Sequence, residues 1–178
     1  MDSKPRALRI HRGNDFRDTA GASAFRHRIG SRDAGRFPVK YLLDVNVLLA
    51  WGWVDHIEHR RTASWIAAAR AVKDVTLLTS PIPELGFVRV SVQRTGGHVS
   101  VAVAARTLAG MLESLGTRHR FLPDDLSSKK DWPAWCGGAS RTTDAHLLAL
   151  AGKRGAHLLT LDAGIPGALL LSDSVPPL

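Results

Sequence analysis

The sequence has one cysteine, few aromatic side chains and no long apolar run, and each shortage excludes a class of protein. Cys136 can form neither an intramolecular disulfide nor a thiolate metal cluster, which argues against a secreted disulfide scaffold and a zinc site. No apolar stretch approaches the ~20 residues of a membrane span. No Walker-type glycine loop is present. We therefore expect a cytoplasmic protein without membrane association.

Length and charge divide the chain into a short basic segment and one domain. The 178 residues with 44% hydrophobic content suit a single globular domain, which we assign to residues 39–178. Residues 1–38 hold nine Lys and Arg against four Asp, a net +5 of the total +8. The remaining +3 on residues 39–178 is weak evidence for a nucleic-acid partner.

Residues 1–38 show neither helical nor alternating apolar periodicity, and we predict a disordered or loosely held basic arm. The segment has no apolar core of a secretory signal. Its Arg and Ser content is similar to that of organellar transit peptides, but its four aspartates count against that interpretation. A start of the natural product near Val39 is a third interpretation.

Beyond residue 38, short apolar strands alternate with helical patterns. Strands are predicted at 40–44, 75–79, 119–123, 157–160 and 168–171, and helices at 56–72, 80–92, 100–115 and 142–151, with a short helix or turn at 45–53. Residues 124–138 read as a polar, mobile loop whose acids, Asp124, Asp125 and Asp131, are solvated. This alternation is typical of an α/β fold with a parallel sheet covered on both faces.

The starts of two predicted helices rest on local signals. Ser80 followed by Pro81 suits the N-cap and first position of a helix, although Val88, Val90 and Val92 alternate as in a strand. We favour the helix because Leu85, Val88 and Val92 share one helical face and because two prolines, Pro81 and Pro83, mark its start. In the segment 142–151 a threonine is predicted at the N-cap.

Four acids occupy corresponding points of this pattern. Asp44 and Asp162 each follow a short apolar strand, Glu84 lies just past the second strand, and Asp144 falls in the first turn of a helix. Each alone has a simpler explanation as a turn or capping residue. Together they would meet at the carboxyl edge of a parallel sheet, where ligands bind. Gathered acids repel one another unless cations are present, so the pattern predicts one or two divalent metal ions.

Four sequence blocks, in this order, resemble those of PIN-domain nucleases and, more closely, VapC-type toxin ribonucleases. They are Leu42-Leu43-Asp44-Val45-Asn46, Pro81-Ile82-Pro83-Glu84-Leu85-Gly86-Phe87-Val88-Arg89-Val90, Thr142-Thr143-Asp144-Ala145-His146-Leu147-Leu148-Ala149-Leu150-Ala151 and Leu158-Leu159-Thr160-Leu161-Asp162. The resemblance implies a three-layer α/β/α sandwich with a mainly parallel central sheet. It also implies Mg²⁺- or Mn²⁺-dependent endoribonuclease activity on RNA, a homodimer, and a small cognate antitoxin.

Residue by residue, the resemblance implies catalytic and metal-binding roles for Asp44, Glu84, Asp144 and Asp162. It implies supporting roles for Asn46, Thr160 and Thr143, because polar neighbours orient crowded carboxylates. Arg89 lies five residues after Glu84 and could pair with an acid, meet a phosphate or be an ordinary surface arginine.

Other functions and sites stay open at this point. The alternatives are a PIN nuclease of RNA processing without an antitoxin, a receiver domain with Asp44 as phospho-acceptor, and a catalytically silent PIN-like binding module. His56 and His59, with Glu58, have the spacing of helical metal ligands but no third ligand nearby. Trp51, Trp53 and Trp65 could stack on bases or belong to the core.

Overall fold

The computed structural model describes residues 38–129 and 131–172. The chain divides into two units, 1–34 and 35–178, and every described residue lies in the second. Apart from Pro38, the arm predicted for residues 1–38 lies outside the described residues. None of the helices in the described ranges has the length and apolar character to cross a membrane.

Five parallel strands form one central sheet in the order β3-β2-β1-β4-β5. They are β1 (Val39–Leu43), β2 (Val75–Thr79), β3 (His119–Phe121), β4 (His157–Thr160) and β5 (Leu169–Leu170). The chain runs outward from β1 to β3 and then returns to β4 on the other side of β1. The strand order therefore reverses between β1 and β4, and in such sheets the carboxyl ends at this reversal form the usual ligand site.

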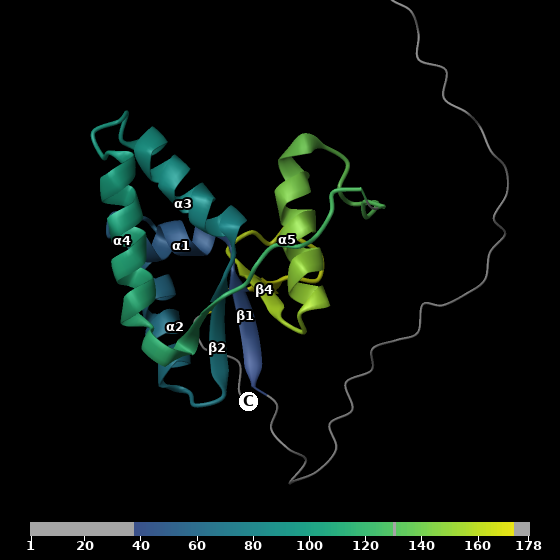
Figure 1. Ribbon diagram of the computed structural model, residues 1–178, viewed down its shortest axis with the longest axis horizontal. Helices are drawn as coiled ribbons and strands as arrows, with labels where there is room; N and C mark the ends of the chain where they lie inside the picture. The colour runs from purple at the N-terminus through teal and green to yellow at the C-terminus, as the bar shows by residue number, and fades with distance from the viewer. Residues whose placement is uncertain (1–37, 130, 173–178) are drawn as a thin grey trace, which may run out of the picture. The chain divides into compact units, whose positions relative to one another are not determined.

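Helices cover both faces of the sheet, which confirms the predicted three-layer α/β/α architecture (Figure 1). One layer contains α1 (Val45–Gly52), α2 (His59–Ala71), α3 (Pro81–Arg94) and α4 (Val101–Ser114), and the other contains α5 (Thr142–Lys153). Two short 3-10 turns, η1 (Gly116–Arg118) and η2 (Ala139–Arg141), precede β3 and α5.

Alternation along the strands gives each layer its own core. Tyr41 and Leu43 of β1 face the cluster that contains Trp65 of α2, whereas Leu42 between them faces the cluster that contains Leu147 of α5. All five side chains are at most 2% exposed. Trp65 is therefore a core residue that no base can reach. The sheet is buried on both faces, as parallel sheets require.

The ambiguous segment 80–92 is helical, as predicted, and belongs to α3. Pro81 occupies its first position, where a missing N–H costs nothing. Ser80 precedes it with an extended backbone, but its hydroxyl makes no capping hydrogen bond. The position of the helix start follows from the two prolines, Pro81 and Pro83, rather than from the serine side chain.

The predicted threonine N-cap of α5 is wrong. The residue before the helix is Arg141, and Thr142 already lies inside the first turn. The reason is the 3-10 turn Ala139–Arg141, which leads directly into the helix. The Thr142 hydroxyl donates a hydrogen bond back to the carbonyl oxygen of Ala139, at 2.8 Å, and so stabilises that turn instead of capping α5.

Helix α3 crosses α1 closely at a glycine. Gly86 is buried, and a Cβ placed there would lie 2.6 Å from Cγ2 and 3.0 Å from Cγ1 of Val45. Val45 directly follows Asp44 in the chain. The contact therefore sets the distance between α3 and the carboxyl end of the central strand.

Gly86→Ala is expected to lower the free energy of unfolding by about 1–3 kcal/mol, the usual cost of overpacking. The β-branched Val45 is stiff about χ1 and has little freedom to move away. Thermal unfolding followed by circular dichroism measures the effect. Gly110→Ala in α4 is the matched control, because its added Cβ would meet nothing within 4 Å beyond its chain neighbours and the backbone of its own helix. The control should unfold at the parent temperature or slightly above it; equal temperatures for both variants would contradict the close approach.

Candidate active site

Asp44 stands where β1 ends and α1 begins, at the centre of the carboxyl edge. It is the N-cap of α1, and its Oδ1 accepts a hydrogen bond from the Val45 N–H at 2.6 Å. Its Oδ2 accepts a hydrogen bond from the Thr160 hydroxyl at 2.8 Å. Only 4% of the residue is exposed. Both carboxylate oxygens are thus fixed, at the point where the strand order reverses.

Thr160, the last residue of β4, links the polar groups around Asp44. Besides donating to Asp44, its Oγ1 accepts hydrogen bonds from Asn46 Nδ2 at 3.0 Å and from the Asp162 N–H at 3.1 Å. The Asn46 Oδ1 in turn accepts from the Leu161 N–H at 3.0 Å. One buried hydroxyl therefore ties the ends of β1 and β4 together and fixes the backbone that carries Asp162.

Three of the four predicted acids influence one another electrostatically. Burial raises the pKa of Asp44, the charges of Asp144 and Asp162 raise it further, and the hydrogen bonds from Thr160 and Val45 oppose the shift. The pKa of Asp144 is also raised, first by burial and then by the charge of Asp162, against an opposing effect of Arg141. The end of β1, the start of α5 and the turn after β4 thus bring like charges to one place.

Arg141 is a site residue that sequence reasoning missed. Its guanidinium donates a hydrogen bond from Nη1 to the Gly164 carbonyl oxygen, and the Gly164 N–H donates to Asp162 Oδ1 at 2.7 Å. Arg141 also partly offsets the charge of Asp144. It therefore holds the turn that carries Asp162. A basic residue three positions before Asp144 was the only signal, and such a residue is common near helix ends.

Glu84 lies at the same edge of the sheet but has different partners. From the first turn of α3 its Oε1 accepts a hydrogen bond from the Thr79 hydroxyl at 2.5 Å. The Thr79 oxygen also contacts His119 Nε2 at 2.8 Å. Burial lowers the pKa of His119, against the opposing charge of Glu84. In the described residues Glu84 is thus held over β2 and β3, whereas the other three acids gather over β1 and β4.

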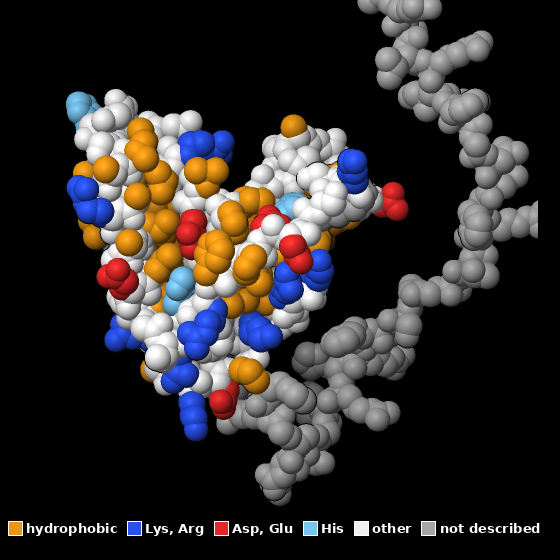
Figure 2. Space-filling view, viewed as in Figure 1, with side chains coloured by type: hydrophobic (Ala, Val, Ile, Leu, Met, Phe, Trp, Pro, Cys, Tyr) orange, Lys and Arg blue, Asp and Glu red, His pale blue; other side chains and the backbone are white. Residues whose placement is uncertain are grey.

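Arg89 and Thr143 face a common hollow between α3 and α5. This pocket of 240 Å³ is lined by Val45, Ile82, Leu85, Gly86, Arg89 and Thr143. Arg89 is exposed, and the ion pairs of the described residues include none between Arg89 and an acid. Figure 2 shows the surface hollowed between the layer of α3 and α4 and the helix α5, with acidic side chains along it. The guanidinium is therefore open to a ligand in this hollow.

The donor set suits a hydrated divalent cation. Within residues 38–129 and 131–172, no three His, Cys, Asp or Glu side chains stand close enough to share an ion as direct ligands. Mg²⁺ does not require that, since it keeps several waters and takes one or two protein carboxylates. Burial is the main cause of the raised pKa values of Asp44 and Asp144, and repulsion among Asp44, Asp144 and Asp162 adds to it, so a cation would relieve the site.

The two histidines considered as metal ligands are engaged elsewhere, and only His59 is helical, since α2 begins at His59 and His56 lies in the turn before it. His56 Nδ1 accepts a hydrogen bond from the Glu58 N–H at 3.1 Å, and His59 Nδ1 lies 2.9 Å from the Ala50 carbonyl oxygen. The Trp53 indole donates to the Ser91 hydroxyl at 3.0 Å and lies under the Arg94 guanidinium. These contacts fix the layer of helices α1 to α3 and have no part in the acid cluster.

A three-layer α/β/α fold with carboxylates at the reversal of strand order is consistent with the PIN-like architecture. No protein-family model matches the chain. The chain is 42% identical over 127 residues to the ribonuclease VapC38 of Mycobacterium tuberculosis, covering 70% of this chain and 86% of that protein. It is 39% identical over 130 residues to the ribonuclease VapC39, covering 70% of this chain and 89% of that protein. The chain belongs to the VapC ribonuclease family.

A solved structure gives a weaker likeness. The crystal structure of PAE2754 from Pyrobaculum aerophilum aligns with a TM-score of 0.42 and 18% identity, over 76% of this chain and 91% of that chain. Family membership rests on the sequence relatives alone.

Proposed function

We propose that the protein is an endoribonuclease toxin that hydrolyses RNA phosphodiester bonds with Mg²⁺ or Mn²⁺ held at the acid cluster. The observation that carries the proposal is the convergence of Asp44, Asp144 and Asp162 from separate parts of the chain at the reversal of strand order. Membership of the VapC ribonucleases supports the RNA substrate.

The chain's own residues divide the work of binding and orientation. Asp44, Asp144 and Asp162 would hold the ion, and Glu84 would join them from the far side of the same edge. The ion, when bound, would supply a water nucleophile at neutral pH and offset the charge on the phosphate. Thr160 and Asn46 keep Asp44 in one rotamer through the hydrogen bonds at β4. Arg89 would bind a phosphate of the RNA in the hollow it shares with Thr143.

The partners are part of the same proposal. A VapC toxin is paired with a small antitoxin protein, and we propose such a partner here, with a homodimer as the assembly and the cytoplasm as the compartment. The alternative is a PIN nuclease that processes RNA without an antitoxin, and an adjacent antitoxin-like reading frame would separate the two. A receiver domain is disfavoured because the relatives that place the chain in its family are ribonucleases.

Internal cleavage of RNA and its dependence on Thr160 test the proposal together. Purified protein with Mg²⁺ should cut a single-stranded RNA into fragments, resolved on a sequencing gel. Thr160→Val removes the hydroxyl that fixes Asp44, and we expect the rate to fall about 10- to 100-fold, as for other groups that orient metal ligands. Thr160→Ser keeps the hydroxyl and should retain most of the activity. Intact RNA with both Mg²⁺ and Mn²⁺ would contradict the proposed function.

A further inference from the structure

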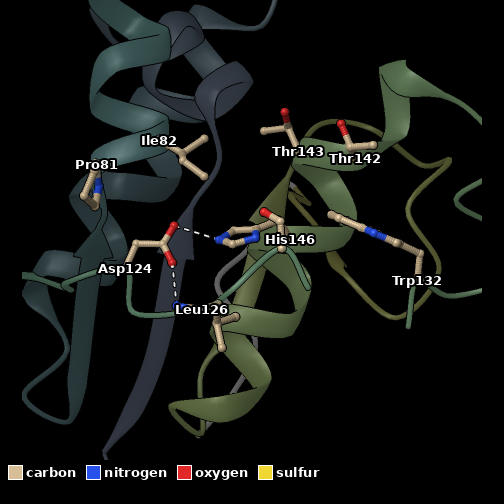
Figure 3. A pocket seen from close by; sticks show the side chains of 9 residues that line it. Pro81, Ile82, Asp124, Leu126, Trp132, Thr142, Thr143 and His146 are labelled. Carbon is tan, nitrogen blue, oxygen red and sulfur yellow. Dashed lines mark hydrogen bonds and ion pairs between the residues drawn. The ribbon is translucent and has the colours of Figure 1, made fainter. Parts of the chain in front are cut away.

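A larger pocket continues from the acid cluster toward the loop after β3. It has a volume of 510 Å³ and is lined by Pro81, Ile82, Asp124, Leu126, Ser128, Trp132, Thr142, Thr143 and His146 (Figure 3). It shares Ile82 and Thr143 with the hollow that Arg89 lines. Asp144 is the next residue after Thr143. The pocket and the acid cluster therefore meet at the start of α5.

One wall of the pocket is a hydrogen-bonded pair of side chains. His146 Nε2 lies 2.7 Å from Asp124 Oδ2, and the two side chains are only 9% and 13% exposed. The Leu126 N–H donates to the other Asp124 oxygen at 3.2 Å. The expectation that Asp124 is a solvated loop residue is wrong, because His146 on α5 draws it inward. A half-buried carboxylate with both oxygens fixed forms a rigid hydrogen-bond acceptor at the pocket surface.

Part of the remaining wall is apolar or aromatic, and Ser128, Thr142 and Thr143 add hydroxyl groups. Pro81 and Ile82 come from the start of α3, and Trp132 comes from the loop after β3. Trp132 is 37% exposed. In Figure 3 the His146 imidazole lies between Asp124 and Trp132. A pocket of this size with an aromatic wall and a few fixed polar groups has the character of a small-ligand site.

We propose that this pocket binds one unpaired nucleobase of the RNA, stacked on Trp132 and hydrogen-bonded through an amino group to Asp124. The inference rests on the proposed function, since it places a base beside the phosphate that the acid cluster would cut. Aromatic side chains bind single-stranded bases by stacking, which tolerates any base. The carboxylate adds selectivity, because it only accepts hydrogen bonds.

The Asp124 carboxylate, as a hydrogen-bond acceptor, predicts which bases the pocket prefers. Adenine, cytosine and guanine present amino groups as donors, and acceptance from the cytosine amino group by a carboxylate is known from DNA complexes. Uracil has no amino group, and its one edge donor, N3–H, lies between two carbonyl oxygens that would face the Asp124 carboxylate unfavourably. The pocket should therefore favour amino-bearing bases over uracil at one position of the RNA.

Fluorescence anisotropy with labelled hexanucleotides of adenine, cytosine or uracil tests the inference. Excess EDTA prevents cleavage, so binding is measured apart from activity. The adenine and cytosine probes should bind about tenfold more tightly than the uracil probe, within the usual range for one base contact. Trp132→Ala should weaken the adenine probe by about 5- to 150-fold. Trp132→Phe keeps a stacking ring and should weaken it less.

Two further variants complete the design. Asp124→Asn preserves the size of the side chain and can still accept from His146, but its amide also donates. We expect it to bring uracil close to adenine in affinity. Phe121→Ala, on β3, is the matched control, because Phe121 is also an exposed aromatic residue (51%) but does not line the pocket. It should bind all probes like the parent.

The outcomes separate this inference from the proposed function. If the parent cleaves RNA with Mg²⁺ but Trp132→Ala and Asp124→Asn bind all probes unchanged, the pocket holds no base and the inference is overturned. If the parent binds none of the three hexanucleotides, the inference is also overturned. If binding depends on Trp132 and Asp124 while the parent cleaves no RNA with either metal, the base pocket stands and the nuclease proposal fails. Should Trp132→Ala not fold, the other two variants decide.

Discussion

Asp44→Asn is expected to abolish metal-dependent RNA cleavage while the protein stays folded. The change removes one charge from the acid cluster and keeps the shape of the side chain. Loss of one ion-binding carboxylate should cost several kcal/mol of transition-state stabilisation, which is about 10³-fold or more in rate. Single-turnover cleavage of a labelled RNA measures the rate, and circular dichroism measures the fold.

Asp125→Asn is the matched control for this prediction. Asp125 lies on the loop after β3 and forms ion pairs with Lys153 at 3.2 Å and Arg154 at 2.9 Å, away from the acid cluster. It is exposed, and such pairs contribute little to stability. The control should cleave RNA like the parent. Cleavage by Asp44→Asn at the parent rate would remove Asp44 from the mechanism.

Removal of divalent ions is expected to have an effect of similar size. EDTA should silence cleavage, and excess Mg²⁺ or Mn²⁺ should restore it, because the acids alone provide no activated water. The ion should also stabilise the folded protein, by about 2.7 kcal/mol at a concentration one hundred times its dissociation constant. Thermal unfolding with and without Mg²⁺ gives a readout that does not depend on activity.

The same unfolding experiment distinguishes the acid cluster from other binding sites. Mg²⁺ should raise the Tm of the parent and of Asp125→Asn, but hardly that of Asp44→Asn. Full turnover in EDTA, or an equal Tm increase in all three proteins, would exclude the proposed metal site.

The sequence predicted the strands and helices well because their apolar runs are bounded by strong local signals. The strand at 75–79 and the strand at 157–160 have the predicted bounds. Segment 80–92 fits both a strand and a helix, and the pair Pro81 and Pro83 correctly indicated the helix. The meeting of Asp44, Asp144 and Asp162 at one edge was expected from this alternation, since parallel strands share one carboxyl edge, whereas the order of the strands was not predicted.

The contacts that set the details of the site could not be predicted in this way. Thr79 holds Glu84, Arg141 holds the turn of Asp162, and His146 draws in Asp124. Asp124 and His146 lie 22 residues apart, and no apolar or polar periodicity in the sequence links them. The N-cap of α5 was misplaced because a 3-10 turn before a helix gives the same polar pattern as a cap.

The most direct test of the central claim is a crystal structure of the protein soaked in Mn²⁺, with the ion located by its anomalous signal. We predict a manganese peak bound by Asp44, with Asp144 and Asp162 as ligands directly or through bound water, and with Thr160 still donating to Asp44. A structure with no manganese among these three carboxylates, or with the ion bound elsewhere on the molecule, would contradict it.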